Sequence, residues 1–108
     1  MPVIGVPTSS PTNFTPSLYL VRVKRELRIT LPTDDTRLLD LIQEAATALQ
    51  EFLSLELVDE GTVADETTQV ALTPLHLRYI TVYVAMQYTM DEDLKSMLDT
   101  VLLLVRDL

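Results

Sequence analysis

The feature that most constrains the fold is a run of apolar residues that repeats at steps of three and four between positions 35 and 53. Such spacing places these side chains on one face of an α-helix, with the acidic residues of the segment mostly off that face. The pattern predicts a long amphipathic helix over residues 35–53, capped at its start by Asp34 or Asp35. The apolar members are Leu38, Leu41, Ile42, Ala45, Leu49, Phe52 and Leu53.

Two further segments in the second half of the chain predict helices. Residues 74–88 open with Pro74, which suits the first turn of a helix, and they are apolar around most of the circumference. A helix of this kind is expected to be central and buried. Residues 90–107 follow the capping-box pattern Thr89-x-x-Glu92 and carry apolar residues down one side. The sequence therefore predicts a last amphipathic helix at the end of the chain.

The first 16 residues differ from the rest of the chain. They hold four of the six prolines and no charged side chain, so we expect an extended arm. Its apolar side chains have no partner in the local sequence, which favours docking on a neighbouring subunit or another protein. A passive tail without a role is the alternative. The apolar residues in question are Val3, Ile4, Val6 and Phe14.

Two segments remain open to more than one interpretation. Residues 17–29 fit a strand when read with period two and a helix when read through Leu20, Val23 and Leu27. Residues 54–72 are predicted to form a long acidic loop, with a loose hairpin as the alternative. The acidic residues that we single out in this loop are Asp59, Glu60, Asp65 and Glu66.

The chain is small for its apolar content. It has 108 residues, of which 47% are hydrophobic, so part of the apolar surface is expected to contact other subunits. The predicted fold class is all-α, a small bundle of about four helices with an acidic loop. The predicted organisation is an arm over residues 1–16 followed by a helical domain over residues 17–108. The longest apolar run, residues 101–105, is too short to span a bilayer.

Charge is distributed unevenly along the chain. The net charge is −8, but residues 1–30 carry four basic residues against one acidic residue, a net charge of +3. The remaining residues carry four basic against fifteen acidic residues, a net charge of −11. This asymmetry suits subunits that attract each other head to tail, with a solvated helix face and a phosphate contact as alternatives. The basic residues of the first segment are Arg22, Lys24, Arg25 and Arg28.

The sequence offers little catalytic chemistry. It has no cysteine, and its single histidine, His76, has no patterned metal-ligating partner, so a position at the surface or in a helix cap is expected. Gly5 and Gly61 are too few for a phosphate-binding loop. The acidic run at residues 91–93 is attributed to helix-start electrostatics rather than to a cation site. We therefore predict no enzyme, no metal and no cofactor.

The order of these elements resembles the small head–tail connector (adaptor) proteins of tailed bacteriophages. The matching parts are residues 18–27 as a first helix, Leu27-Arg28-Ile29 after it, the turn Asp34-Asp35, residues 38–45 of the long helix, and residues 72–80 at the start of the third helix. The resemblance covers about residues 17–105. It favours the helix over the strand for residues 17–29.

The resemblance implies a structural subunit of the virion, made in the host cytoplasm and placed at the head–tail junction. It implies a homo-oligomeric ring, commonly a dodecamer, below the portal protein and above a tail completion or stopper protein. DNA is expected to pass through the ring without specific binding, and the acidic loop is a candidate lining of that channel or a partner contact. No membrane is involved. The competing interpretation is a small helical regulatory protein that sequesters a partner.

Overall fold

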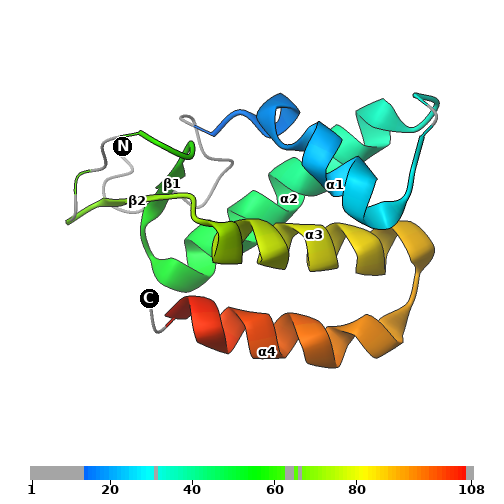
Figure 1. Cartoon of the computed structure of the whole chain (residues 1–108). Helices are drawn as coiled ribbons and strands as arrows, with labels where there is room; N and C mark the ends of the chain where they lie inside the picture. The colour runs from blue at the N-terminus through cyan, green and yellow to red at the C-terminus, as the bar shows by residue number, and fades with distance from the viewer. Residues whose placement is uncertain (1–13, 31, 63–64, 66, 107–108) are drawn as a thin grey trace, which may run out of the picture.

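The computed structural model describes residues 14–30, 32–62, 65 and 67–106, and it is mostly helical (Figure 1). The elements in chain order are η1 (Pro16–Leu18), α1 (Leu20–Leu27), α2 (Asp35–Leu53), β1 (Glu56–Val58), β2 (Gln69–Ala71), α3 (Pro74–Thr89), η2 (Glu92–Leu94) and α4 (Lys95–Arg106). The described part is a small helical bundle, as predicted. The helical interpretation of residues 17–29 is confirmed, because α1 forms there.

The core forms where α3 packs between α2 and α4. Figure 1 shows α3 at the centre, with α4 along one side and α1 and α2 on the others. Ile42 and Leu49 of α2 and Ile80 and Val84 of α3 are fully buried in this core. Burying a side chain of this size contributes about 1.5–3 kcal/mol of hydrophobic free energy. The apolar face predicted for α2 is confirmed for its buried members but is wrong for Phe52, which is 40% exposed. The central position predicted for α3 is confirmed.

The predicted cap of α2 is wrong. The helix does begin after Asp34, but no side-chain hydrogen bond caps it. Asp34 instead accepts a hydrogen bond of 2.5 Å from the hydroxyl of Tyr88 on α3. Asp35 accepts one of 2.6 Å from Lys24 on α1. Each carboxylate joins α2 to another helix, Asp34 to α3 and Asp35 to α1, and the helix start is left without a side-chain cap.

The predicted capping box at the last helix is also wrong. Thr89 is the final residue of α3, and its hydroxyl donates to the carbonyl of Ala85 in the same helix. Asp91 then caps the short helix η2 by accepting a hydrogen bond of 2.9 Å from the amide of Asp93. The α-helix α4 starts only at Lys95. The acidic run at residues 91–93 therefore belongs to a helix start, as expected.

The segment between α2 and α3 is not a hairpin. Its two strands pair in parallel, with Leu57 opposite Val70. Leu57 is fully buried, and its amide donates to the side chain of Gln50, which anchors β1 on α2. Parallel strands cannot be joined by a tight turn, because the chain must return to the end where the first strand started. The hairpin alternative for this segment is therefore wrong.

Phe14 belongs to the folded domain. Its ring is 5% exposed and stacks on the ring of Tyr19, with 5.2 Å between the centroids. The expectation that Phe14 lacks a local partner is therefore wrong, and the folded part reaches at least to residue 14. Val3, Ile4 and Val6 lie outside the described residues.

Three helices end at a left-handed residue that is not glycine. The φ angles are 58° at Arg28 after α1, 57° at Ser54 after α2 and 57° at Met90 after α3. Side chains with a Cβ atom are disfavoured in this region of backbone space. Each of these sharp helix ends therefore carries a conformational cost that a glycine would avoid.

Among the described helices, none has the length and apolar character needed to cross a membrane.

Candidate interaction surfaces

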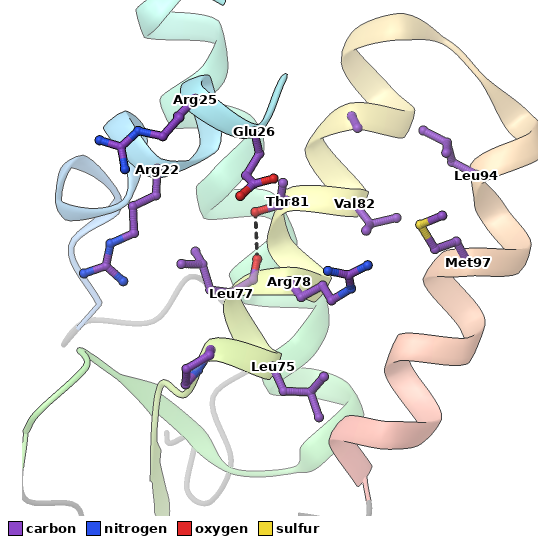
Figure 2. A pocket seen from close by; sticks show the side chains of 12 residues that line it. Arg22, Arg25, Glu26, Leu75, Leu77, Arg78, Thr81, Val82, Leu94 and Met97 are labelled. Atoms are coloured by element: carbon purple, nitrogen blue, oxygen red, sulfur yellow. Dashed lines mark hydrogen bonds between the residues drawn. The ribbon is translucent and has the colours of Figure 1, made fainter. Parts of the chain in front are cut away.

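A groove of about 710 Å³ lies along one side of α3, between α1 and the first turns of α4 (Figure 2). Its floor is formed by α3, where the hydroxyl of Thr81 donates to the carbonyl of Leu77 and is thus satisfied within the helix. The groove joins parts of the chain that lie far apart in the sequence. Its lining residues are Arg22, Arg25 and Glu26 of α1, Pro74, Leu75, Leu77, Arg78, Thr81, Val82 and Ala85 of α3, Leu94 of η2 and Met97 of α4.

The two walls of the groove differ in chemistry. The α1 wall is charged, whereas the α4 wall is apolar and includes Met97, which is 46% exposed (Figure 2). Within the described residues the ion pairs are Arg22–Glu60 and Lys24–Asp35, so Arg25 and Arg78 pair with no described carboxylate. An apolar floor with unpaired arginines beside it fits a partner segment that carries both apolar and acidic groups.

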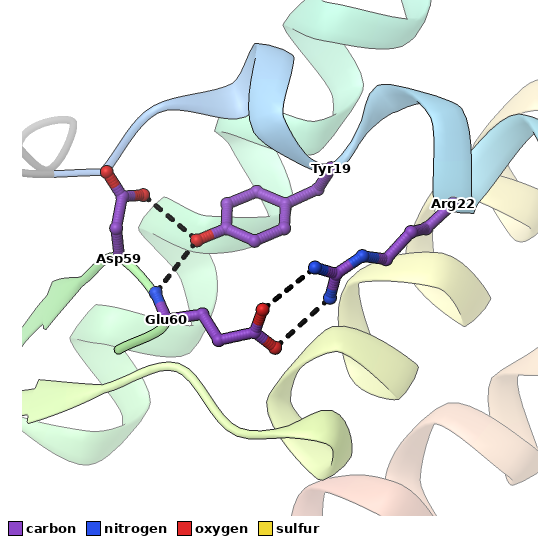
Figure 3. Close-up of polar contacts among 4 residues, drawn as sticks. All are labelled: Tyr19, Arg22, Asp59 and Glu60. Carbon is purple, nitrogen blue, oxygen red and sulfur yellow. Dashed lines mark hydrogen bonds and ion pairs between the residues drawn. The ribbon is translucent and has the colours of Figure 1, made fainter. Parts of the chain in front are cut away.

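A second cluster joins the N-terminal segment to the turn after β1 (Figure 3). The hydroxyl of Tyr19 donates to Asp59 and accepts from the amide of Glu60, each at 3.0 Å. Asp59 also accepts from the amide and the hydroxyl of Thr15, each at 2.8 Å. Arg22 donates two hydrogen bonds to Glu60, at 2.8 and 3.1 Å. The cluster ties α1 to the acidic loop within one subunit.

The electrostatics of this cluster are consistent with its geometry. Burial, together with the hydrogen bond to Asp59, raises the pKa of Tyr19 to about 12, so its hydroxyl stays a donor at neutral pH. The guanidinium of Arg22 holds the pKa of the Glu60 carboxyl below its usual value. The pair of Arg22 and Glu60 is largely exposed, which makes its net contribution to folding small.

The four basic residues predicted for a subunit interface fall into two groups. Arg22 and Lys24 pair with Glu60 and Asp35 of their own chain. Arg25 and Arg28 are exposed and make no ion pair with a described residue. An interface role for all four stays a prediction.

The acidic loop is partly committed to contacts within its own chain. Asp59 and Glu60 bond to the N-terminal segment, as described above. Asp65 accepts hydrogen bonds from the amide and the hydroxyl of Thr67, and these bonds lower the pKa of its carboxyl. Glu66 lies outside the described residues. A channel or partner role for this loop stays a prediction.

An acidic stripe on α2 was not singled out from the sequence. Asp40, Glu44 and Glu51 are exposed and stand four and seven residues apart, which places them on one face of the helix. Glu44 accepts a hydrogen bond of 2.5 Å from the hydroxyl of Tyr83. In the sequence these residues indicate only the polar side of an amphipathic helix. Their spacing of four and seven residues would have predicted that they lie along one face.

His76 is a buried capping residue. Its ring accepts a hydrogen bond of 2.9 Å from the amide of Thr73, and the hydroxyl of Thr73 accepts one of 3.4 Å from the amide of His76. Because the amide of Thr73 only donates, the ring nitrogen Nδ1 is an acceptor and the neutral ring carries its proton on Nε2. Burial lowers the pKa of His76. In the part of the chain that the structure describes, no group of three or more His, Cys, Asp or Glu side chains is placed to hold a metal ion.

The chain was also compared with known proteins. A family model described as "Phage gp6-like head-tail connector protein" matches residues 17–100. No curated protein and no solved structure matches the chain. The matched segment begins in η1 and ends within α4, so it includes both the groove and the acidic stripe of α2. Because this match spans most of the sequence and the helices follow the predicted order, the chain belongs to the gp6-like head–tail connector family of phages.

Proposed function

We propose that this chain is a non-catalytic structural subunit that forms a ring at the head–tail junction of a tailed phage, below the portal protein. The family match over residues 17–100 is the observation that carries this proposal. In this role the ring, commonly of about twelve copies, gives the tail completion or stopper protein a surface to attach to. The subunit works by shape and contact rather than by chemistry.

The surface of the isolated subunit supports an assembled state. Several large apolar side chains are at least 40% exposed, on η1, on α1, on α2, at the end of α3 and on α4. Exposed apolar surface of this extent commonly marks contacts with other proteins. These side chains are Leu18, Val21, Phe52, Met90, Met97, Leu103 and Leu104. In a ring with partner proteins above and below, these apolar side chains can pack against other subunits or against the partners.

The charge of the chain supports passage of DNA without binding. The net charge is −8, and carboxylates that line a channel repel the phosphate backbone. The candidate lining is the loop with Asp59, Glu60, Asp65 and Glu66. Of these, Asp59 is held by Thr15 and Tyr19, which leaves the later part of the loop as the better candidate.

The test is the mass of the native protein, followed by images of the particles. Native mass spectrometry at several concentrations is expected to show a large cyclic oligomer, alone or after addition of the portal protein. Negative-stain images are expected to show rings with an open centre. A stable dimer that ignores the portal protein contradicts the proposal and supports a small helical regulatory protein.

A further inference from the structure

We propose that the groove of one subunit receives the exposed face of α2 from a second copy of the chain. Each subunit then offers α2 to one neighbour and its groove to the other. This inference rests on the proposed function, because it names the contact that closes the ring.

The two surfaces lie on opposite sides of α3. The groove runs over Arg78 and Thr81 (Figure 2). Tyr83 stands two residues after Thr81, which places it on the other side of the helix, and its hydroxyl bonds to Glu44 of α2. Figure 1 shows α2 passing behind α3 while α1 and α4 flank it. A contact between opposite faces of identical subunits is heterologous, and repetition of such a contact builds a closed ring when the rotation permits.

The charges of the two surfaces are complementary. The groove carries Arg25 and Arg78, neither of which pairs with a described carboxylate, against Glu26. The exposed face of α2 carries Asp40, Glu44 and Glu51 against Arg37. Asp40 and Glu51 have no ion pair or hydrogen bond with a described residue. Opposite charges with no partner in their own subunit favour a contact between subunits and fix its register.

The lengths of the two surfaces also agree. The groove floor extends along α3 from Pro74 to Ala85, and the acidic stripe extends along α2 from Asp40 to Glu51. Each span covers eleven residue-to-residue steps of helix, which at the usual rise is about 16 Å. The floor is therefore as long as the acidic stripe that is laid along it.

The groove adds an exposed apolar side chain to its charges. Met97, on the apolar wall of the groove, is 46% exposed. Methionine is flexible and adapts its shape to the surface of a partner. An interface that joins charged pairs to an apolar centre is typical of stable protein contacts.

The experiment reverses the charges of each surface separately. The groove variant is Arg25→Glu with Arg78→Glu, and the stripe variant is Asp40→Arg with Glu51→Arg. Arg22 and Glu44 are kept because they bond within the chain. Circular dichroism of each variant is expected to match the wild type, since all four side chains are exposed. Each variant alone is expected to assemble about tenfold more weakly, or not at all, by native mass spectrometry.

Mixing the two variants gives the deciding result. The acidic groove of one variant now faces the basic stripe of the other, and the unchanged surfaces remain complementary, so an equimolar mixture is expected to regain rings of alternating subunits. The matched control is Asp93→Arg with Asp99→Arg, which reverses two exposed acidic side chains that make no ion pair or hydrogen bond with a described residue. This control is expected to assemble normally.

Three outcomes overturn the inference. Normal assembly of either variant alone shows that its surface is not in the interface, and failure of the mixture shows that the two surfaces do not meet. If the Asp93 and Asp99 control loses assembly while the stripe variant assembles normally, the groove binds the surface around Asp93 and Asp99 of the neighbour instead of α2. In all three cases the wild-type ring survives, so the proposed function stands. That function fails only if the wild type forms no ring.

Discussion

Tyr19 and Asp59 are joined by a hydrogen bond of 3.0 Å across 40 residues of sequence. The ring of Tyr19 is 1% exposed and stacks on Phe14, while its hydroxyl also accepts from the amide of Glu60. One side chain thus holds the N-terminal segment, α1 and the acidic loop together. Several properties of the subunit follow from this contact and from the other features described above.

Replacing Tyr19 by phenylalanine is expected to lower the free energy of unfolding by about 1–2 kcal/mol, because the amide of Glu60 loses its acceptor and Asp59 loses a donor. Urea unfolding followed by circular dichroism measures the change. The matched control is Tyr88→Phe, which removes a hydrogen bond to Asp34 from a more exposed site and is expected to cost less. Equal stability of Tyr19→Phe and wild type contradicts this role.

Stability is expected to fall as the pH drops from about 7.5 to about 5.5, and His76 is the cause. Burial lowers the pKa of His76 in the folded state below the reference value of 6.5, so the unfolded chain binds a proton more readily. The loss therefore starts near the unfolded pKa and ends at the lower folded pKa.

The variant His76→Gln separates this effect from the titration of carboxylates. Glutamine at this helix position also completes a capping box with Thr73 but does not titrate. Urea unfolding at both pH values is expected to show a smaller pH dependence for the variant. An unchanged slope shows that other groups cause it.

Replacing Met90 by glycine is expected to raise the free energy of unfolding by about 0.5–1 kcal/mol, because glycine adopts the left-handed conformation without strain. The residue has a φ of 57° and is 78% exposed, so little packing is lost. Thermal or urea unfolding measures the gain. Met90→Ala is the control, since alanine keeps the Cβ atom and is expected to give little change. A gain of the same size in both variants rules out the backbone explanation.

Deleting residues 2–13 is expected to leave the domain folded and to impair joining to the portal or to a neighbouring subunit, because Val3, Ile4 and Val6 are removed. Co-sedimentation with the assembled partner measures the joining. Removing Phe14 as well is expected to cost about 3–5 kcal/mol, the usual effect of truncating a buried aromatic residue. If the protein without residues 2–13 joins its partner normally, the arm is a passive tail and docking lies in the helices.

The isolated protein is expected to bind duplex DNA weakly and without sequence preference, since carboxylates outnumber basic groups by sixteen to eight. Fluorescence anisotropy at low and physiological salt measures the binding. Tight binding at physiological salt, lost in Arg25→Glu with Arg28→Glu, assigns a phosphate contact to the exposed end of α1 instead.

The long helices were predictable because their signal is local. The apolar spacing in α2 and the proline at the start of α3 each act within one helix. Both helices form where these signals predict them. Helix caps were less predictable. A carboxylate near a helix start can bond to donors on other elements instead of to the amides of its own helix. Asp34 bonds to Tyr88, which is 54 residues away, and no local pattern announces that contact. The parallel strands were missed because three residues each are too short for a period to show.

The groove was beyond sequence reasoning for a different reason. Its residues run from Arg22 to Met97, so it exists only once α1, α3 and α4 are packed. The basic segment itself was visible in the sequence. Which of its residues form ion pairs within the subunit was not. Arg22 and Lys24 find partners within the subunit, whereas Arg25 does not, and that difference depends on where each side chain points from α1.

The attachment of α4 along a single side has a consequence for motion. Leu98, Val101 and Val105 are buried, while Leu103 and Leu104 are 58% and 51% exposed. A helix held mainly by one neighbour opens at a lower free energy than a core in which elements support one another on several sides. In the free subunit the amide hydrogens of α4 therefore exchange with solvent before those of α2. The same subunit combines a rigid centre with an outer helix whose order depends on what the assembly places against it.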